Sequence, residues 1–130
     1  MATQEWHCGR LIDHIGLVVR DLAASKAFYS AVFGVLKIPM GSDGRDFWAD
    51  ELYIGARDSE PGQGEMTRRI HIAFQAQDRA MVDAFYQAAM AHGGRDNGKP
   101  GLRADYGENY YAAFVVDPEG YRLEAYTSAK

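Results

Sequence analysis

Short segments of the chain alternate apolar and polar residues, which is the pattern of strands that bury one face and expose the other. Two of these segments each precede a helical pattern, and two pairs of segments follow the helices. The expected strands are residues 11–19, 46–49, 52–56, 69–75, 110–116 and 121–126. The last two are joined by Asp117-Pro118-Glu119-Gly120, a turn with Pro at its second position and Gly at its fourth. The pattern therefore predicts a closing hairpin.

Two helices are predicted where apolar residues recur at the spacing i, i+3, i+4, i+7 and i+8. Asp21 and Asp78 occupy good N-cap positions, and glycines are expected to end the helices at Gly34 and at residues 93–94. The apolar stripes are Ala24, Ala27, Phe28, Ala31 and Val32 in the first helix and Met81, Ala84, Phe85, Ala88 and Ala89 in the second. We interpret both stripes as core packing.

The segment from position 14 to position 31 recurs 57 residues later without a gap. Eight of these eighteen positions carry the same residue in both copies, where typical residue frequencies give about one match by chance. The matched pairs are His14/His71, Ile15/Ile72, Asp21/Asp78, Ala23/Ala80, Ala27/Ala84, Phe28/Phe85, Tyr29/Tyr86 and Ala31/Ala88. Similar amphipathic demands explain the matched Phe and Ala, but they do not readily explain the matched His and Asp together. We therefore expect a duplicated unit, with the Gly-rich stretch 58–67 as its linker and a second Gly-rich loop at 93–108.

Composition restricts the classes of function. The chain has 130 residues, of which 47% are hydrophobic and 25% charged, as in a single globular domain, and its formal net charge is −4. Because it has no basic run, we do not expect it to bind nucleic acid. No apolar stretch approaches the roughly 18 residues of a membrane span. Cys8 is the only cysteine, which excludes an internal disulfide and suits a reducing compartment, most simply the cytoplasm.

Three strands are each expected to place one metal ligand on the face away from the helices. Successive strand residues point to opposite faces, so the apolar set that contacts a helix leaves His14, His71 and Glu124 on the other side. Two imidazoles and one carboxylate form a facial set with open positions, suited to Fe, Mn, Zn or Ni. This hypothesis requires the three groups to converge on one point. The alternative is that each is an ordinary, partly buried polar side chain. For His92, at a helix C-terminus, a capping role suffices.

The same residues carry a resemblance to a known superfamily. From about residue 11 to residue 127, the chain resembles the vicinal oxygen chelate superfamily of glyoxalases, bleomycin-resistance proteins and extradiol dioxygenases. The likeness rests on the segment 13–19 (Asp-His-Ile-Gly-Leu-Val-Val), on the helix with its leading Asp and its Phe-Tyr pair, and on His71. It is strongest in the closing hairpin, residues 114–124.

The resemblance implies an α+β fold of two βαβββ modules, at about residues 10–57 and 68–128 of one domain that spans 1–130. Their curved mixed sheets would form an incomplete β-barrel around a divalent metal ion, with the helices outside. The family's ligand positions carry over to His14, His71 and Glu124, in agreement with the strand faces. Members commonly form homodimers, sometimes with modules exchanged between chains.

A possible fourth ligand distinguishes branches of the superfamily. Glyoxalase I enzymes have a Glu on the last strand of the first module, whereas here Tyr53 stands at the counterpart of Glu124. Glu51, two residues away, would need a register shift to take this place. Three protein ligands are more similar to the fosfomycin-resistance and extradiol dioxygenase branches, and the retained triad argues against the metal-free antibiotic-binding branch.

The resemblance implies a metal-dependent enzyme acting on a small molecule chelated through adjacent oxygens, either a glyoxalase-like lyase or isomerase or an extradiol-type dioxygenase. The alternative is a binding or resistance protein that sequesters its small-molecule ligand without turnover. The candidate catalytic residues are Tyr53, Tyr126 and Arg122. Further candidates to line or cover the site are Trp48, Tyr110, Tyr111, Lys99 and Arg103, of which the two cations would clamp an anionic group.

Overall fold

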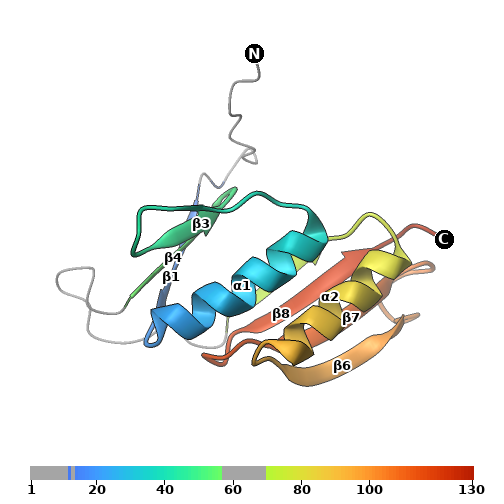
Figure 1. The fold of residues 1–130 in the computed structure, drawn as a ribbon. Helices are drawn as coiled ribbons and strands as arrows, with labels where there is room; N and C mark the ends of the chain where they lie inside the picture. The colour runs from blue at the N-terminus through green and yellow to red at the C-terminus, as the bar shows by residue number, and fades with distance from the viewer. Residues whose placement is uncertain (1–11, 13, 57–69) are drawn as a thin grey trace, which may run out of the picture.

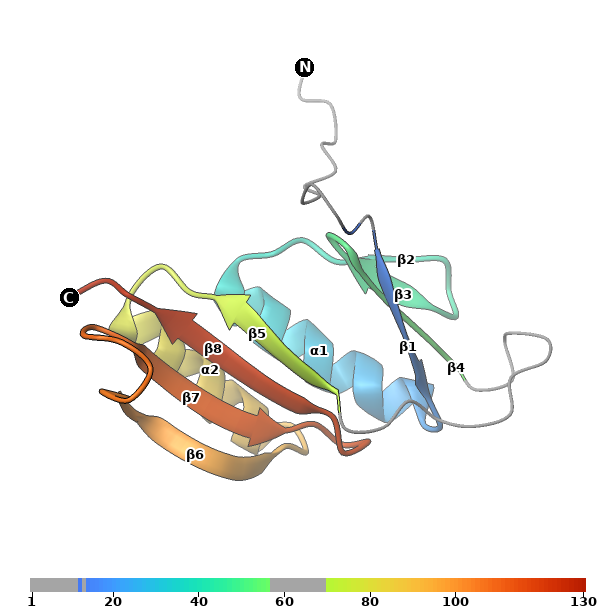
Figure 2. The same ribbon diagram turned by 180° about the vertical axis from the view of Figure 1, so that it is seen from behind.

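Two four-stranded sheets and two helices make up the fold (Figure 1). The computed structural model describes residue 12 and residues 14–56 and 70–130. In chain order the elements are β1 (Ile15–Val19), α1 (Leu22–Leu36), β2 (Gly41–Ser42), β3 (Phe47–Ala49), β4 (Leu52–Ala56), β5 (His71–Gln75), α2 (Arg79–Ala91), β6 (Arg95–Leu102), β7 (Tyr111–Val116) and β8 (Arg122–Thr127). The helices lie next to each other on one side of the sheets, and Figure 2 looks onto the other side. The linker expected at 58–67 lies outside the described residues.

The two sheets repeat one topology. Their strand orders are β1-β4-β3-β2 and β5-β8-β7-β6. In each sheet the strand that comes first in the sequence pairs in parallel with the strand that comes last, β1 with β4 and β5 with β8. Gly16 lies opposite Tyr53 in the first sheet, and its repeat counterpart Ala73 lies opposite Glu124 in the second. Tyr53 is therefore the structural counterpart of Glu124, as predicted. Two sheets of the same topology confirm the predicted α+β fold of two modules. The sheets do not join into one closed barrel, in agreement with the incomplete barrel that was expected. We call β1–β4 with α1 module 1, and β5–β8 with α2 module 2.

Each helix begins at the predicted aspartate. The Asp21 carboxylate accepts a hydrogen bond from the Ala24 amide at 3.0 Å, and the Asp78 carboxylate accepts one from the Met81 amide at 2.8 Å. At the far end of α2, Nδ1 of His92 lies 2.9 Å from the carbonyl oxygen four residues earlier. The capping roles of all three side chains are thus confirmed.

The end predicted for α1 is wrong. The helix continues past Gly34 to Leu36 and ends at Lys37, whose φ of 62° lies in the left-handed region. The Lys37 amide bonds to carbonyls of the last helical turn. Glycine is favoured at such a position without being required, so the sequence signal fell three residues early. Within the described part of the chain, neither helix is long and apolar enough to cross a membrane.

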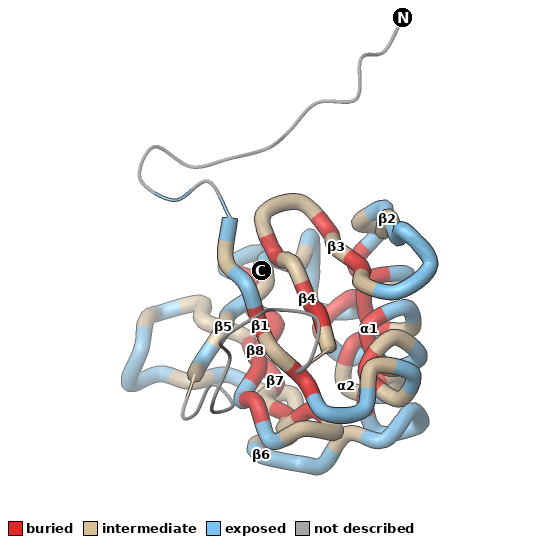
Figure 3. The backbone as a smooth tube through the Cα atoms, turned by 90° about the vertical axis from the view of Figure 1, so that its left-hand side faces the viewer, coloured by how far each residue is buried: buried red, intermediate tan, exposed pale blue. Residues whose placement is uncertain are grey.

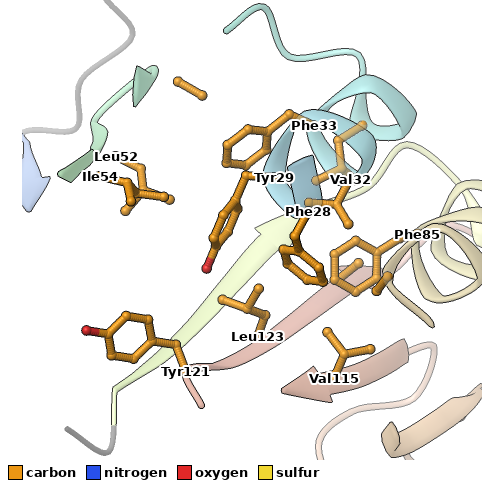
Figure 4. Packing of buried hydrophobic residues seen from close by; sticks show 14 of the residues in the cluster. Phe28, Tyr29, Val32, Phe33, Leu52, Ile54, Phe85, Val115, Tyr121 and Leu123 are labelled. Carbon is orange, nitrogen blue, oxygen red and sulfur yellow. The ribbon is translucent and has the colours of Figure 1, made fainter. Parts of the chain in front are cut away.

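Large side chains decide which face of each helix is buried. The buried residues of α1 are Ser25, Phe28, Tyr29, Val32, Phe33 and Leu36. Ala27 of the predicted stripe is exposed, and in α2 Val82 is buried in place of Ala84. Burial stabilises in proportion to the apolar area removed from water, so burying an aromatic or branched side chain contributes more than burying an alanine. The buried face of each helix is therefore rotated slightly from the predicted stripe. The predicted core role of Phe28 and Phe85 is confirmed (Figure 4). Figure 3 shows where the buried parts of the backbone lie among the strands and helices.

The Gly-rich stretch at 93–108 contains a strand where a loop was expected. β6 pairs antiparallel with β7, but the register shifts between Asp96 and Gly98 and again between Gly98 and Gly101. Gly98 has a φ of 146°, a conformation that residues with a side chain rarely adopt. Such bulges interrupt the alternation from which strands are predicted, which explains the error.

The turn between β7 and β8 makes hydrogen bonds to module 1 as well as within itself. Oδ1 of the buried Asp117 accepts hydrogen bonds from the amides of Glu119 and Tyr121, both at 2.8 Å. Its Oδ2 accepts one at 2.6 Å from the hydroxyl of Tyr29 on α1. Burial and then the adjacent carboxylate raise the pKa of Tyr29 well above its ordinary value, so this hydroxyl stays protonated and donates. Burial also raises the pKa of Asp117, although its hydrogen bonds oppose that change.

Further bonds from the same turn reach β1 and the start of α1. The Glu119 carboxylate accepts a hydrogen bond from the Asp21 amide at 2.8 Å and lies 3.3 Å from Nε of Arg20. The Tyr121 hydroxyl donates to the carbonyl of Val18. Residues 117–121, which we call the junction turn, therefore fasten module 2 to module 1. In Figure 4 the hydroxyl end of the Tyr29 ring points toward the side of the core where Tyr121 lies.

Candidate active site

The face of the second sheet opposite α2 carries the candidate site. On β5, Ile72 and Phe74 pack against the buried core, and on β8 Leu123 belongs to that core. Because side chains alternate along a strand, His71 and Glu124 lie on the opposite face, which Figure 2 turns toward the reader. The strand faces predicted from the sequence are thus confirmed for module 2.

His71 and Glu124 form a close pair. Nε2 of His71 lies 2.7 Å from Oε1 of Glu124, and the side chain of His71 is 43% exposed whereas that of Glu124 is 5% exposed. Oε2 of Glu124 accepts a hydrogen bond at 2.6 Å from the hydroxyl of Tyr110. Both carboxylate oxygens are engaged, so the orientation of this buried acid is fixed.

Tyr110 is the residue that orients Glu124. Burial, together with the hydrogen bond and the charge of Glu124, raises the pKa of Tyr110 to about 12. The phenol therefore stays protonated at neutral pH and keeps donating to the carboxylate. Its ring stacks on Tyr126 with the centroids 4.1 Å apart. The predicted catalytic residue Tyr126 thus contacts the site through Tyr110.

A cavity of about 400 Å³ opens beside His71. Its lining comprises His71, Asn97, Gly98, Arg103, Tyr106, Phe114 and Arg122. Arg122 stands directly opposite His71 in the β5–β8 register. The guanidinium of Arg103 lies over the ring of Phe114, 5.2 Å from its centroid. Two predicted residues, Arg103 and Arg122, are therefore gathered next to the predicted ligand His71.

Two other candidates from module 2 do not line this cavity. The ammonium of Lys99 is 3.4 Å from a carboxylate oxygen of Asp96. Tyr111 lies on the helix side of the sheet, where its hydroxyl donates to Asp83 at 2.6 Å. The side chains of Lys99 and Tyr111 are therefore bonded to Asp96 and Asp83, neither of which lines the cavity.

Tyr53 and Trp48 lie together on the first sheet. Their rings stack with the centroids 5.7 Å apart and an angle of 5° between the planes. The Tyr53 hydroxyl donates to Oδ2 of Asp46 at 2.9 Å. The predicted catalytic residue Tyr53 is thus part of module 1 and is not among the residues that line the cavity beside His71.

His14, the third predicted ligand, directly precedes β1 in module 1. In Figure 2, β1 and β5 run in roughly opposite directions, so the residues that begin them lie at opposite ends of the two strands. Among residues 12, 14–56 and 70–130, no group of three His, Cys, Asp or Glu side chains is arranged to hold a metal ion. One chain therefore brings together His71 and Glu124 but does not bring His14 to them.

The pair from module 2 nevertheless fits a divalent metal ion. A neutral imidazole nitrogen and a carboxylate oxygen are ligands that Fe, Mn, Zn and Ni all accept. Two ligands at about 2.1 Å from one ion stand roughly 3.0–3.4 Å apart. The 2.7 Å separation of His71 and Glu124 needs only a small increase to reach that spacing. Tyr110 occupies the other carboxylate oxygen and would keep Oε1 directed at the ion.

Several residues of the site were not singled out from the sequence. Strand alternation could have identified Phe114: its neighbour Val115 faces the core, so Phe114 points to the open face. There it stands opposite Glu124 in the β7–β8 register. Tyr110 was named only as a lining residue, since nothing in the pattern links it to a carboxylate fourteen positions away. Asn97 lies in the bulged strand that was expected to be a loop.

Comparison with known proteins connects this arrangement to one superfamily. Residues 11–125 match the model of the Glyoxalase/Bleomycin resistance protein/Dioxygenase superfamily. The uncharacterized protein YaeR of Escherichia coli (strain K12) is 29% identical over 128 residues, which cover 88% of this chain and 94% of YaeR. A glyoxalase/bleomycin resistance protein from Albidiferax ferrireducens T118 superposes with a TM-score of 0.74 at 28% identity, covering 89% of this chain and 98% of its own. Lactoylglutathione lyase from Agrobacterium tumefaciens shares the fold, with a TM-score of 0.62 at 20% identity over 91% of this chain and 93% of its own.

Proposed function

Because the chain belongs to the Glyoxalase/Bleomycin resistance protein/Dioxygenase superfamily, we propose that it is a divalent-metal-dependent enzyme. Its substrate is a small molecule that chelates the ion through two adjacent oxygens, and its reaction is a lyase or isomerase step or an extradiol-type oxygenation. The observation that carries this proposal is the His71–Glu124 pair, held at 2.7 Å on an open sheet face beside a cavity.

In this proposal a homodimer completes the ligand set. Among the described strands, β1 and β5 are at the edges of their respective sheets, and in the proposed dimer these edges lie next to the second molecule. If module 1 of one copy faces module 2 of another, His14 of the second copy approaches His71 and Glu124 of the first. The two-fold axis of such a dimer would generate two equal sites, each with two imidazoles and one carboxylate.

The side chains around the pair have distinct tasks in this mechanism. A bound divalent ion would polarise the two substrate oxygens and stabilise the negative charge that develops on them. Tyr110 holds the Glu124 carboxylate in one orientation. Because its pKa is about 12, the phenol stays protonated at neutral pH and keeps donating this hydrogen bond. Arg122, beside His71, and the ring of Phe114 form the wall against which the substrate lies.

Metal content tests the proposal. We expect protein purified without chelator to hold about one ion per chain, and we expect His14→Ala, His71→Ala and Glu124→Ala each to lose it. His92→Ala is the control, because His92 caps a helix and should leave the metal in place. A wild-type protein that binds none of Fe, Mn, Zn or Ni would contradict the proposal.

A mixing experiment tests whether the site is shared between copies. In a heterodimer of the His14→Ala and Glu124→Ala chains, one of the two sites regains all three ligands, whereas the other loses two. Random pairing of equal amounts should therefore restore metal to about a quarter of the sites. The absence of any recovery would show that His14 does not act across a dimer.

A binding protein that sequesters its ligand is the second candidate function. The observation in its favour is that the described part of one chain gathers only two of the three ligands, while module 1 presents a stacked aromatic pair. Turnover of methylglyoxal with glutathione, of catechols, or of fosfomycin with glutathione would support the enzyme. Tight binding of one of these molecules by metal-free protein, without turnover, would support sequestration.

A further inference from the structure

The cavity beside His71 is basic although the chain as a whole is acidic. Arg103 and Arg122 line it and, among the described residues, no carboxylate does, whereas the formal net charge of the chain is −4. The ion pairs within the described residues join Arg20 to Glu119, His71 to Glu124 and Lys99 to Asp96, so neither cavity arginine takes part. Two guanidinium groups that face one cavity without a carboxylate partner form an attractive position for an oxyanion.

Two glycines make room for the guanidinium of Arg103. A Cβ atom on Gly101 would meet its Nη1 at 3.1 Å, and a Cβ atom on Gly98 would meet its Nη2 at 3.3 Å and Phe114 at 3.0 Å. Nη2 also donates to the carbonyl of Lys99 at 2.6 Å, and the guanidinium plane rests over the Phe114 ring. The group is thus held in place in advance, so little side-chain entropy remains to be lost when an anion binds.

The same cavity reaches His71, one member of the candidate metal pair. His71 lines it and faces Arg122 across the β5–β8 ladder. The rings of His71 and Phe114 have centroids 6.3 Å apart, and Phe114 stands opposite Glu124 in the β7–β8 register. A molecule that fills the cavity therefore contacts His71 as well as the arginines.

We infer that this cavity binds the anionic end of a small organic molecule, a carboxylate or a phosphonate, between Arg103 and Arg122. Its volume of about 400 Å³ suits a small organic molecule better than a lone inorganic ion. Phe114 and Tyr106 supply aromatic surface for the uncharged part. Anion binding in this cavity needs no metal and does not depend on the proposed function. Only the statement that the bound anion is the enzyme's substrate rests on the proposed function. Arg122, predicted to be catalytic, thereby becomes a substrate-binding residue.

The test is a titration of the chelator-treated full chain with three probes at constant ionic strength. Phenylphosphonate and benzoate are the anionic probes, benzamide is the neutral one, and NMR shifts of the arginine Nε–H groups report binding. Both anions should bind, and the tighter of them identifies the preferred group, whereas benzamide should not bind. Arg103→Gln and Arg122→Gln should each weaken anion binding by about tenfold or more.

Three further variants keep the test decisive. Arg95→Gln removes an exposed cation from the same strand as Gly98 and should leave anion affinity within about twofold of wild type. Gly101→Ala keeps both charges but crowds the guanidinium of Arg103, so it should weaken binding by a few-fold. If Arg103→Gln fails to fold, Arg103→Lys replaces it and should bind the anions more weakly than wild type, because a lysine lacks the planar fork.

Failure of this inference is distinguishable from failure of the proposed function. Equal weakening by Arg95→Gln, binding of benzamide as tight as that of benzoate, or no binding of either anion would overturn the inference. Metal content measured on the same arginine variants should remain at the wild-type level. Anion binding that persists in His71→Ala, with its metal lost, would support the cavity assignment whether or not the protein is an enzyme.

Discussion

The two modules share a backbone plan but present different chemistry on their open faces. In both sheets the first and last strands pair in parallel with equivalent registers, so position 53 of module 1 corresponds to position 124 of module 2. Module 1 has Tyr53 there, stacked on Trp48 and bonded to Asp46. Module 2 has Glu124, bonded to His71 and Tyr110. Module 1 thus presents an aromatic pair on its open face, and module 2 presents a carboxylate with its hydrogen-bond donors.

This difference shows which parts of a duplicated unit are free to change. The N-cap aspartates and the buried Phe28 and Phe85 recur because both helices need the same start and the same core contact. Side chains on the open face carry no such packing requirement, so they diverge without loss of the fold. Function in this chain is therefore expected from the faces that differ.

The largest expected effect comes from the turns, which also differ between the modules. In module 1 the β3–β4 turn is short and places Asp50 at a φ of 48°, whereas the junction turn of module 2 reaches Tyr29 on α1. Asp117→Ala leaves one hydroxyl and two amides without their buried acceptor. We expect it to lower the free energy of unfolding by about 3–5 kcal/mol. Urea denaturation measures this loss.

Asp50→Gly provides the matched change in module 1. Glycine accepts a positive φ without strain, so this variant should stay within about 1 kcal/mol of wild type. If Asp117→Ala and Asp50→Gly had equal effects, the junction turn would not be what fastens the modules together.

The second effect concerns the orientation of Glu124. Tyr110→Phe removes the donor to Oε2 while keeping the ring that stacks on Tyr126. If His71 and Glu124 bind a metal, its affinity should fall by about 10- to 100-fold, as is usual when a partner of a metal ligand is lost. Competition with a chelator of known affinity measures the change. Tyr111→Phe is the control, because it also breaks a hydroxyl–carboxylate bond, to Asp83, but on the helix side of the sheet.

Sequence patterns were informative for the scaffold and for residues within regular strands. Comparison of the last strands of the two modules correctly made Tyr53 the counterpart of Glu124, and alternation placed His71 on the open face. The cavity was harder to foresee, because Gly98 and Asn97 lie in a bulged strand whose periodicity is lost. Tyr110, which the sequence placed in the expected strand 110–116, directly precedes β7, and only the three-dimensional arrangement reveals its bond to Glu124.

A third prediction uses the register to make module 1 resemble module 2. Tyr53→Glu places a carboxylate at the counterpart of Glu124, on the sheet to which His14 leads. If the metal site includes module 1, a fourth ligand there should tighten metal binding by about tenfold. Tyr53→Gln, with the same length and no charge, should not tighten it. Unchanged affinity in Tyr53→Glu would indicate that position 53 does not face the metal.

The smallest effect is a pH dependence that comes from the buried Asp117 of the junction turn. Burial holds the pKa of Asp117 above its ordinary value of 3.8, so the folded chain keeps this proton at pH values where the unfolded chain has released it. The stability that this proton contributes is fully present below pH 3.8 and is lost as the pH rises through the raised pKa. Asp117→Asn does not titrate, so the wild type should lose stability relative to this variant as the pH rises through that window. Thermal unfolding of both proteins at closely spaced pH values measures the difference, and a relative gain by the wild type would show that the hydrogen bonds to Asp117 outweigh its burial.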